Sequence, residues 1–218
     1  MEYFCASIPI IFALLDLPTK SVSLSKSKVL LVEGQTDQEY FHYLQQHNCL
    51  EEKLSAEIEV VPYGGKDTLK NTLLVQFVLR KFDEVFITFD LDAEGDVKSA
   101  LTRLGLKESR DFVGLGLSQP GKECIVGALP QRVLAAVNGR EADLIMKLGG
   151  KDAGERRRAK EQLKQRYLEE FKRHSDYSKD ELKEFTKMVR IINAKLSTPN
   201  KPMERTVRRR SSRPTAHR

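Results

Sequence analysis

The amino-acid sequence predicts an α/β fold in which helices flank a parallel β-sheet. Three observations lead to this prediction: short apolar runs alternate with amphipathic segments, acidic residues follow two of these runs directly, and the charge of the chain reverses after residue 150. Apolar runs that alternate with helices imply right-handed βαβ units, and these units build a parallel sheet. Of the 218 residues, 40% are hydrophobic and 31% are charged, which supports a packed core and excludes a membrane-embedded body.

Four apolar runs are expected to form strands, at residues 28–32, 57–61, 85–89 and 111–117. Amphipathic periodicity predicts helices between them, at residues 36–46, 67–81 and 94–104. We expect Thr36 to cap the first helix, with Glu39 completing a capping box. The apolar face of the second helix should contain Leu69, Leu73, Phe77 and Leu79.

Acidic residues stand where two of these strands end. Glu33 and Asp37 follow the first run, and Asp90 and Asp92 follow the third. Because parallel strands point their carboxyl ends to one edge of a sheet, these side chains can converge on one crevice. Like carboxylates repel unless a cation lies between them or one takes a proton, and oxygen ligands suit Mg²⁺ or Mn²⁺. The alternative is a surface cluster of acids that keeps a loop hydrated.

The pairing of Val32-Glu33-Gly34-x-x-Asp37 with Asp90-x-Asp92-x-Glu94-Gly95 resembles the Toprim domain. Type IA topoisomerases, bacterial primases and the overcoming-lysogenization-defect (OLD) nucleases share this domain. The resemblance extends over about residues 27 to 140. It implies that Glu33 is the general acid/base and a metal ligand, and that Asp90, Asp92 and Asp37 hold the metal. It adds weaker candidates: Asp96 and Glu123 as metal ligands and Lys122 as a catalytic residue.

The resemblance implies a small nuclease that uses Mg²⁺ or Mn²⁺ to hydrolyse phosphodiester bonds of DNA or RNA. Its OLD branch leaves open whether a separate ATPase subunit acts as a partner. Two other functions also stay open: a non-catalytic Toprim-like subunit that binds nucleic acid or regulates, and a phosphatase or phosphotransferase of the DxD type. An EF-hand is excluded because its twelfth position would be Leu101 instead of a bidentate Glu.

The two parts of the chain carry opposite charge. Residues 1–150 contain 16 Lys and Arg against 21 Asp and Glu, a net −5, whereas residues 151–218 contain 21 against 10, a net +11. A basic segment can bind the phosphates of a nucleic acid, although basic ends also occur merely to keep a chain soluble. The candidate phosphate contacts are Lys66, Arg156, Arg157, Arg158, Arg208, Arg209 and Arg210. For Lys66, which follows Gly64 and Gly65, a plain turn is the alternative.

After a helix-like run at 125–137, Gly149-Gly150 marks a break. A charged helix at 152–174 and a second helix at 179–196, opened by Ser178, follow it. The expected division of the chain is an N-terminal arm (1–26), a Toprim-like catalytic domain (27–148), a basic helical extension (149–202) and a disordered Arg-rich tail (203–218).

The remaining composition points to a cytoplasmic protein. The three cysteines are scattered, which favours neither a disulfide framework nor a zinc site. The apolar segment at residues 8–15 is too short to span a bilayer, so we expect a packing arm and no membrane contact. The sequence leaves the oligomeric state open.

Overall fold

The computed structural model describes residues 28–47, 50–119 and 122–196. The expected N-terminal arm and the Arg-rich tail lie outside the described residues. The elements, in chain order, are β1 (Lys28–Val32), α2 (Gln35–Gln46), β2 (Ile58–Pro62), α3 (Lys66–Lys70), α4 (Thr72–Lys81), β3 (Glu84–Asp90), η1 (Leu91–Ala93), α5 (Glu94–Arg103), β4 (Phe112–Leu115), η2 (Ile125–Ala128), α6 (Gln131–Arg140), α7 (Ala142–Leu148), α8 (Ala153–Arg173) and α9 (Lys183–Leu196).

The four strands form one parallel sheet in the order β2-β1-β3-β4. In the register, Leu30 of β1 lies between Val60 of β2 and Phe86 of β3, and Phe89 of β3 pairs with Gly114 of β4. The α/β fold and the four strands predicted from the sequence are therefore confirmed. Because the strands are parallel, all four carboxyl ends lie at the same edge.

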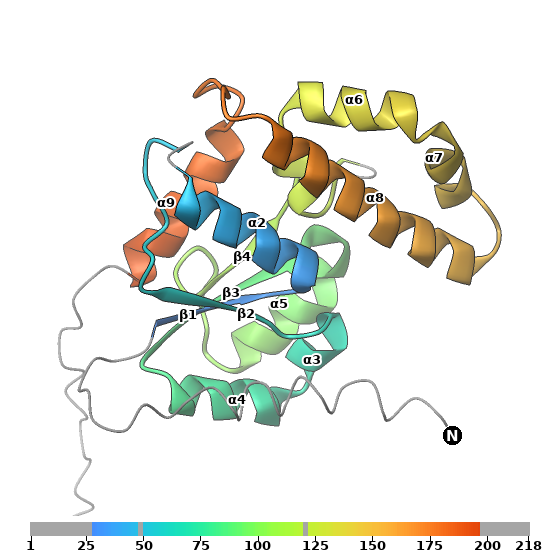
Figure 1. Ribbon diagram of the computed structural model, residues 1–218. Coiled ribbons are helices and arrows are strands. Elements are labelled where there is room, and N and C mark those ends of the chain that lie inside the picture. Colours follow the sequence, from blue (N-terminus) through green and yellow to red (C-terminus); the bar gives the residue numbers. More distant parts are fainter. Residues whose placement is uncertain (1–27, 48–49, 120–121, 197–218) are drawn as a thin grey trace, which may run out of the picture.

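Helices cover both faces of the sheet and make a three-layered molecule (Figure 1). Successive side chains of a strand point to opposite faces. On β1, Val29 and Leu31 face the layer of α3, α4 and α5, whereas Leu30 and Val32 face the layer that contains α2, α8 and α9. Strand β3 is buried along its whole length because it lies between two other strands and beneath both layers.

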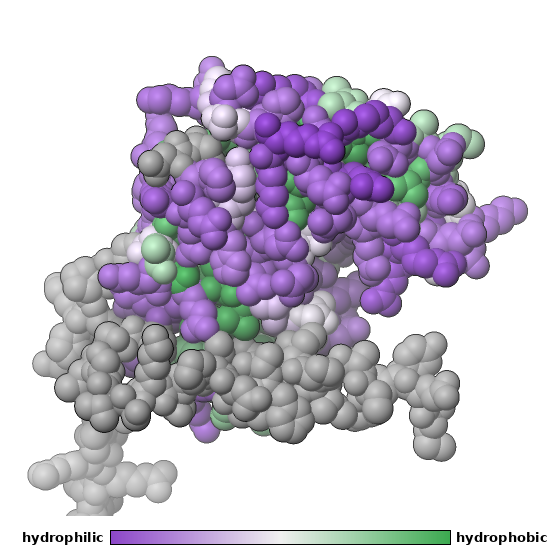
Figure 2. Space-filling view, in the orientation of Figure 1, coloured by the Kyte–Doolittle hydropathy of each residue, from purple (hydrophilic) through white to green (hydrophobic). Residues whose placement is uncertain are grey.

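The basic helices α8 and α9 are built into the same core as the sheet. An apolar stripe along α8 is buried: Leu163, Tyr167, Leu168 and Phe171 pack in one cluster with β1 and α2. The stripe of α9 is buried as well and lies against β3 and β1. Helix α9 begins at Lys183 instead of 179, because residues 179–182 form turns after Ser178, whose hydroxyl accepts the amide of Glu181. The outer surface of α8 and α2 is mostly hydrophilic (Figure 2).

Two predicted helices are wrong in their extent. The helix expected at 67–81 is divided into α3 and α4 at Asn71, whose side chain caps α4 by accepting the amide of Leu74. This break changes the phase, so that Leu73 is 76% exposed and Val75 and Val78 are the buried positions.

The run at 125–137 is likewise interrupted. It forms the 3-10 turn η2 and then α6, with Pro130 at the N-cap of α6. Proline has no amide hydrogen to donate and disfavours a helical conformation in the residue before it. Among the described residues, no helix is long and apolar enough to cross a membrane.

Candidate active site

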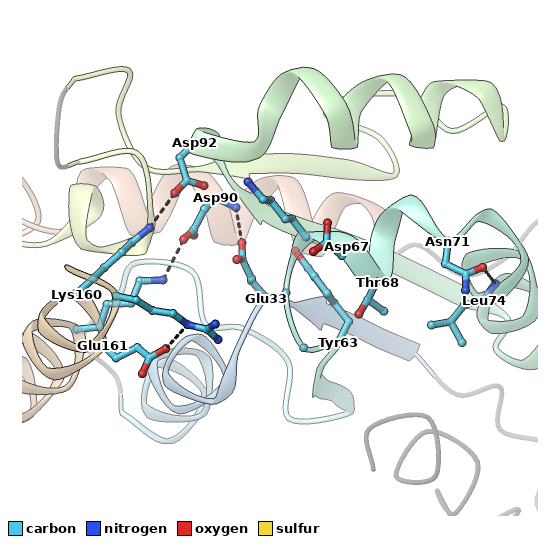
Figure 3. Close-up of a pocket in the computed structure, with 15 residues that line it drawn as sticks. Glu33, Tyr63, Asp67, Thr68, Asn71, Leu74, Asp90, Asp92, Lys160 and Glu161 are labelled. Atoms are coloured by element: carbon cyan, nitrogen blue, oxygen red, sulfur yellow. Dashed lines mark hydrogen bonds and ion pairs between the residues drawn. The ribbon is translucent and has the colours of Figure 1, made fainter. Parts of the chain in front are cut away.

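The acidic residues of both sequence motifs meet at the carboxyl edge of the sheet. Glu33 follows β1, Asp90 is the last residue of the neighbouring strand β3, and Asp92 lies in η1. The Glu33 carboxylate points across the edge and accepts the backbone amide of Asp90, with 3.2 Å between Oε2 and N (Figure 3). Adjacent parallel strands thus place the two motifs side by side.

The turn after β2 fixes the backbone of Glu33. The amides of Gly64 and Gly65 both donate to the Glu33 carbonyl oxygen, at 3.0 and 3.1 Å, and the amide of Tyr63 donates to Val32 at 2.9 Å. Both glycines have a positive φ, which side chains with a Cβ rarely adopt. The amides of both glycines are occupied within the protein, so the Gly-Gly pair is a structural turn, and Lys66 after it lines the cleft.

Asp37 lies behind the acids and is 1% exposed. Its Oδ2 accepts the amide of Gly34, the N-cap of α2, at 3.0 Å. The predicted capping pair of Thr36 and Glu39 is therefore wrong: Gly34 and Asp37 occupy these roles, because α2 begins earlier in the chain. The second oxygen of Asp37 has no hydrogen-bond partner among the described residues.

Two lysines of α8, a helix that follows the sheet in the chain, also contact the acids of the site. Lys164 Nζ contacts Asp90 Oδ2 at 2.9 Å, and Lys160 Nζ contacts Asp92 Oδ2 at 2.8 Å (Figure 3). Lys164 is only 16% exposed in its side chain, so it is the more buried of the two ammonium groups. Both lysines lie on the charged helix predicted at residues 152–174, but neither was predicted to belong to the site. The available signal was their spacing of four residues on the helical face that also carries Leu163.

The buried carboxyls have raised pKa values. Burial raises the pKa of Asp90 to about 7; Asp37 and Glu33 add to this effect, while Lys164 opposes it. Burial also raises the pKa of Glu33, against the Asp90 amide and Lys164, and it raises the pKa of Asp37 against Lys164 and the Gly34 amide. Burial alone would lower the pKa of Lys164, but Asp37 and Asp90 raise it above its ordinary value. The nearby cationic groups therefore do not fully offset the effect of burial on the pKa values of these three carboxyls.

The acids lie at the bottom of a cleft of about 560 Å³ between α3 and α8. One wall is Tyr63, whose hydroxyl donates to the Thr88 carbonyl at 3.0 Å. Two further cationic residues, Lys66 of α3 and Arg157 of α8, also line the cleft. The lining residues are Glu33, Tyr63, Gly64, Gly65, Lys66, Asp67, Thr68, Asn71, Leu74, Asp90, Asp92, Arg157, Lys160, Glu161 and Lys164.

Comparison with known families agrees with this arrangement. Residues 26–92 match the family model described as "Overcoming lysogenization defect protein-like, TOPRIM domain". The segment matches a Toprim domain of the OLD type. The comparisons found no matching curated protein and no matching solved structure. The Toprim match contains Glu33, Asp37, Asp90 and Asp92 and ends before α8, so the two lysines lie outside it.

Three further candidates, Asp96, Lys122 and Glu123, do not line the cleft that holds the acids. Asp96 is exposed on α5 and pairs with Lys70 at 2.9 Å. Lys122 belongs to a turn in which its carbonyl accepts the amide of Leu117, and its side chain does not line the cleft. Glu123 lines an adjoining cavity instead.

Of the arginines on α8 that were predicted to bind phosphate, one lines the cleft and two do not. Arg157 lines the cleft and pairs with Glu161 at 3.2 Å. Arg156 instead donates to the carbonyls of Gly150 and Lys151, and Arg158 is exposed on α8. The tail residues Arg208, Arg209 and Arg210 lie outside the described residues.

The donor set fits a hard divalent cation. In the part of the chain that the structure describes, no group of three or more His, Cys, Asp and Glu side chains is arranged so that it could hold a metal ion as it stands. The Asp90 and Asp92 carboxylates are instead paired with the two lysines of α8. However, Asp37 and Asp90 each have a buried oxygen without a hydrogen-bond partner, and buried polar atoms of this kind normally contact water or an ion. Carboxylate oxygens are the ligands that Mg²⁺ and Mn²⁺ prefer.

Proposed function

We propose that the protein is a metal-dependent nuclease that hydrolyses phosphodiester bonds of DNA or RNA. The observation that carries this proposal is the convergence of Glu33, Asp90 and Asp92 on one cleft, together with the buried ammonium group of Lys164. Phosphodiester hydrolysis needs both an activated water and compensation for the negative charge of the phosphate. The cleft contains residue types for both tasks.

The acids would hold the metal. Glu33, Asp90 and Asp92 supply oxygen ligands from adjacent strands, and Asp37 stands behind them with its free oxygen. A bound Mg²⁺ or Mn²⁺ would supply positive charge to the scissile phosphate and acidify a water molecule.

The lysines would neutralise the phosphate. Lys164 and Lys160 contact Asp90 and Asp92, the same two acids that would hold the metal. With these acids engaged by a metal, both ammonium groups would be able to bind another anion. A phosphate oxygen of the substrate is such an anion, because charge-assisted hydrogen bonds from ammonium groups to phosphate are strong. Lys164 retains its proton at neutral pH because its pKa is raised.

Glu33 is suited to accept a proton from water. Burial raises the pKa of its carboxyl above the ordinary value, which brings it closer to neutral pH. A general base works best when its pKa lies near the pH of the reaction. The hydrogen bond from the Asp90 amide orients the carboxylate and leaves its other oxygen for this task.

The test is a cleavage assay with matched variants. Labelled single- and double-stranded DNA and RNA are incubated with the protein in Mg²⁺, Mn²⁺ or EDTA. Cleavage is expected with a divalent ion and not with EDTA. Glu33→Gln should reduce turnover roughly a hundredfold, the scale of a lost general base, and Asp92→Asn should also abolish most activity. Asp96→Asn is the control, because this neighbouring acid is exposed and lies outside the cleft.

Two results would replace the proposal. If the polynucleotides bind in a salt-dependent manner but are never cleaved, the chain is a non-catalytic subunit that binds nucleic acid. If only phosphomonoesters are hydrolysed, the acids belong to a phosphatase. A purified OLD-type ATPase added to the assay shows whether cleavage depends on such a partner.

A further inference from the structure

A second cavity, of about 260 Å³, adjoins the cleft. Asp92, Lys160 and Lys164 line both spaces. The ion pairs between α8 and the acids therefore form a common wall. Any ligand group bound in the second cavity lies directly beside a phosphate bound at the acids.

The second cavity has mainly apolar walls, in contrast to the charged cleft. Val126 of η2 and Leu163 and Tyr167 of α8 are buried and form its interior, and Leu148 at the end of α7 is 38% exposed. The Tyr167 hydroxyl donates to Asn138 of α6, so its polar atom is already satisfied. An apolar space of this size beside a charged site is suited to a flat, weakly polar ring.

Beyond the common wall, where Lys160 and Lys164 pair with Asp92 and Asp90, one further carboxyl group gives the cavity a second polar side. Glu123 lines it, and the Glu123 carbonyl accepts the amide of Leu91 at 2.6 Å, which ties this residue to the loop that carries the acids. The neighbouring Cys124 is a neutral thiol, because burial raises its pKa to about 11. A carboxylate can only accept hydrogen bonds, so it favours a ring that presents N–H donors.

We propose that this cavity binds the base of an unpaired nucleotide next to the scissile phosphate. This inference rests on the proposed nuclease function and adds a substrate class to it. A base stacked inside a duplex cannot enter a cavity whose interior is formed by buried side chains, so the preferred substrate is single-stranded, or has an unpaired or frayed nucleotide at the cleavage site.

Glu123 makes the cavity selective. Cytosine, adenine and guanine carry exocyclic amino groups that can donate to its carboxylate. Thymine and uracil present carbonyl oxygens at their edges, with one N–H between them, and the carboxylate repels these oxygens. The cavity is therefore expected to prefer amino-bearing bases to thymine and uracil.

The experiment compares small phosphates that differ only in the base. The 3′- and 5′-monophosphates of cytidine and uridine, and ribose 5-phosphate, are titrated into the full-length protein in saturating Mg²⁺, with binding followed by isothermal titration calorimetry and NMR. A cytidine monophosphate should bind about tenfold tighter than ribose 5-phosphate, the effect of one base packed against side chains, and should shift the signals of Val126 and Leu163. Uridine should bind more weakly than cytidine, and Glu123→Gln should remove this difference.

Two pairs of variants test the cavity itself. Val126→Phe fills it, so cytidine and ribose phosphates should then bind equally. If this variant does not fold, Leu148→Ser replaces an apolar wall at the opening, and Met146→Ser is its control on the same helix, since Met146 is 76% exposed and does not line the cavity. Leu148→Ser should weaken only the base-dependent part of binding, and Met146→Ser should change nothing.

The outcomes separate this inference from the nuclease proposal. Equal affinity for ribose 5-phosphate and the nucleotides, or an unchanged base preference in Val126→Phe and Leu148→Ser, overturns the base cavity even if polynucleotides are cleaved. A clear base preference in a protein that cleaves no polynucleotide supports the cavity and overturns the nuclease.

Discussion

Replacing Asp90 by Asn should change how the stability of the protein depends on pH. The Asp90 side chain is 1% exposed, lies between Lys164 and the other acids, and has one oxygen without a hydrogen-bond partner. Burial raises its pKa from 3.8 to about 7. Asn is close to Asp in shape but carries no titratable proton, so the variant removes this one titration.

The sign and size follow from the pKa shift. In the unfolded chain, Asp90 loses its proton near pH 4, whereas in the folded protein it keeps the proton until about pH 7. Between these values the folded state binds more protons, so the free energy of unfolding falls as the pH rises. A shift of about three units, at about 1.4 kcal/mol per unit, corresponds to a loss of about 4 kcal/mol between pH 4 and pH 7.

The assay is urea unfolding of the wild type and Asp90→Asn, without metal, at several values between pH 4 and pH 8. The uncharged amide of the variant is a weaker partner for Lys164, so the absolute stability of the variant can differ at every pH. The informative quantity is therefore the change with pH of the difference between the two proteins. Relative to the wild type, the variant should gain stability steadily from pH 4 to pH 7 and reach a plateau above it. A difference that is the same at all pH values would refute the reasoning, and Asp96→Asn should show no such trend because its carboxyl is exposed.

Four further predictions concern the metal, the tail, the turn after β2 and helix α6. Mg²⁺ or Mn²⁺ should raise the melting temperature of the wild type, because a cation relieves the repulsion among the acids; Asp90→Asn combined with Asp92→Asn should lose this gain in thermal-shift measurements. Residues 203–218 contain six Arg and one Glu. Deleting them should reduce the slope of log binding affinity against log salt concentration by up to about five and leave cleavage at saturating substrate unchanged. An unaltered slope would mean that the tail does not contact phosphate. Gly65→Ala should lower the free energy of unfolding by about 1–2 kcal/mol, because φ is +99° there. Gly139→Ala, in the last turn of α6 where a Cβ meets open space, should raise it by up to about 0.5–1 kcal/mol.

The sequence was sufficient to predict the sheet and its acidic edge because both depend on local patterns. The strands are short apolar runs, and the acids that follow β1 and β3 meet because parallel strands share a carboxyl edge. The exposed positions Leu73 and Phe77 were misassigned, since a single break at Asn71 changes the phase of all later residues in the helix.

The two lysines of the site could not be predicted from local sequence patterns. Lys164 meets Asp90 across 74 positions of sequence, and nothing in the pattern of α8 determines how that helix is rotated over the sheet. Packing determines it: Leu163, Tyr167 and Phe171 are buried in the core, and this fixes the direction in which Lys160 and Lys164 point. The capping partner was misassigned for a similar reason. Asp37 instead of Glu39 takes this role because α2 begins at Gln35, and local patterns do not fix the first residue of a helix to within one or two positions.

The division of the site between two distant segments has a consequence for how such proteins can diversify. The segment that matches the Toprim model ends at Asp92 and contains the acids of the site, whereas the two lysines that pair with Asp90 and Asp92 are carried by α8. Substitutions on one face of that helix can therefore alter the charge balance over an unchanged motif. Two chains with identical acidic motifs could therefore differ in metal affinity or reaction rate. The lysines that would cause the difference lie on a helix outside the segment that the motifs cover.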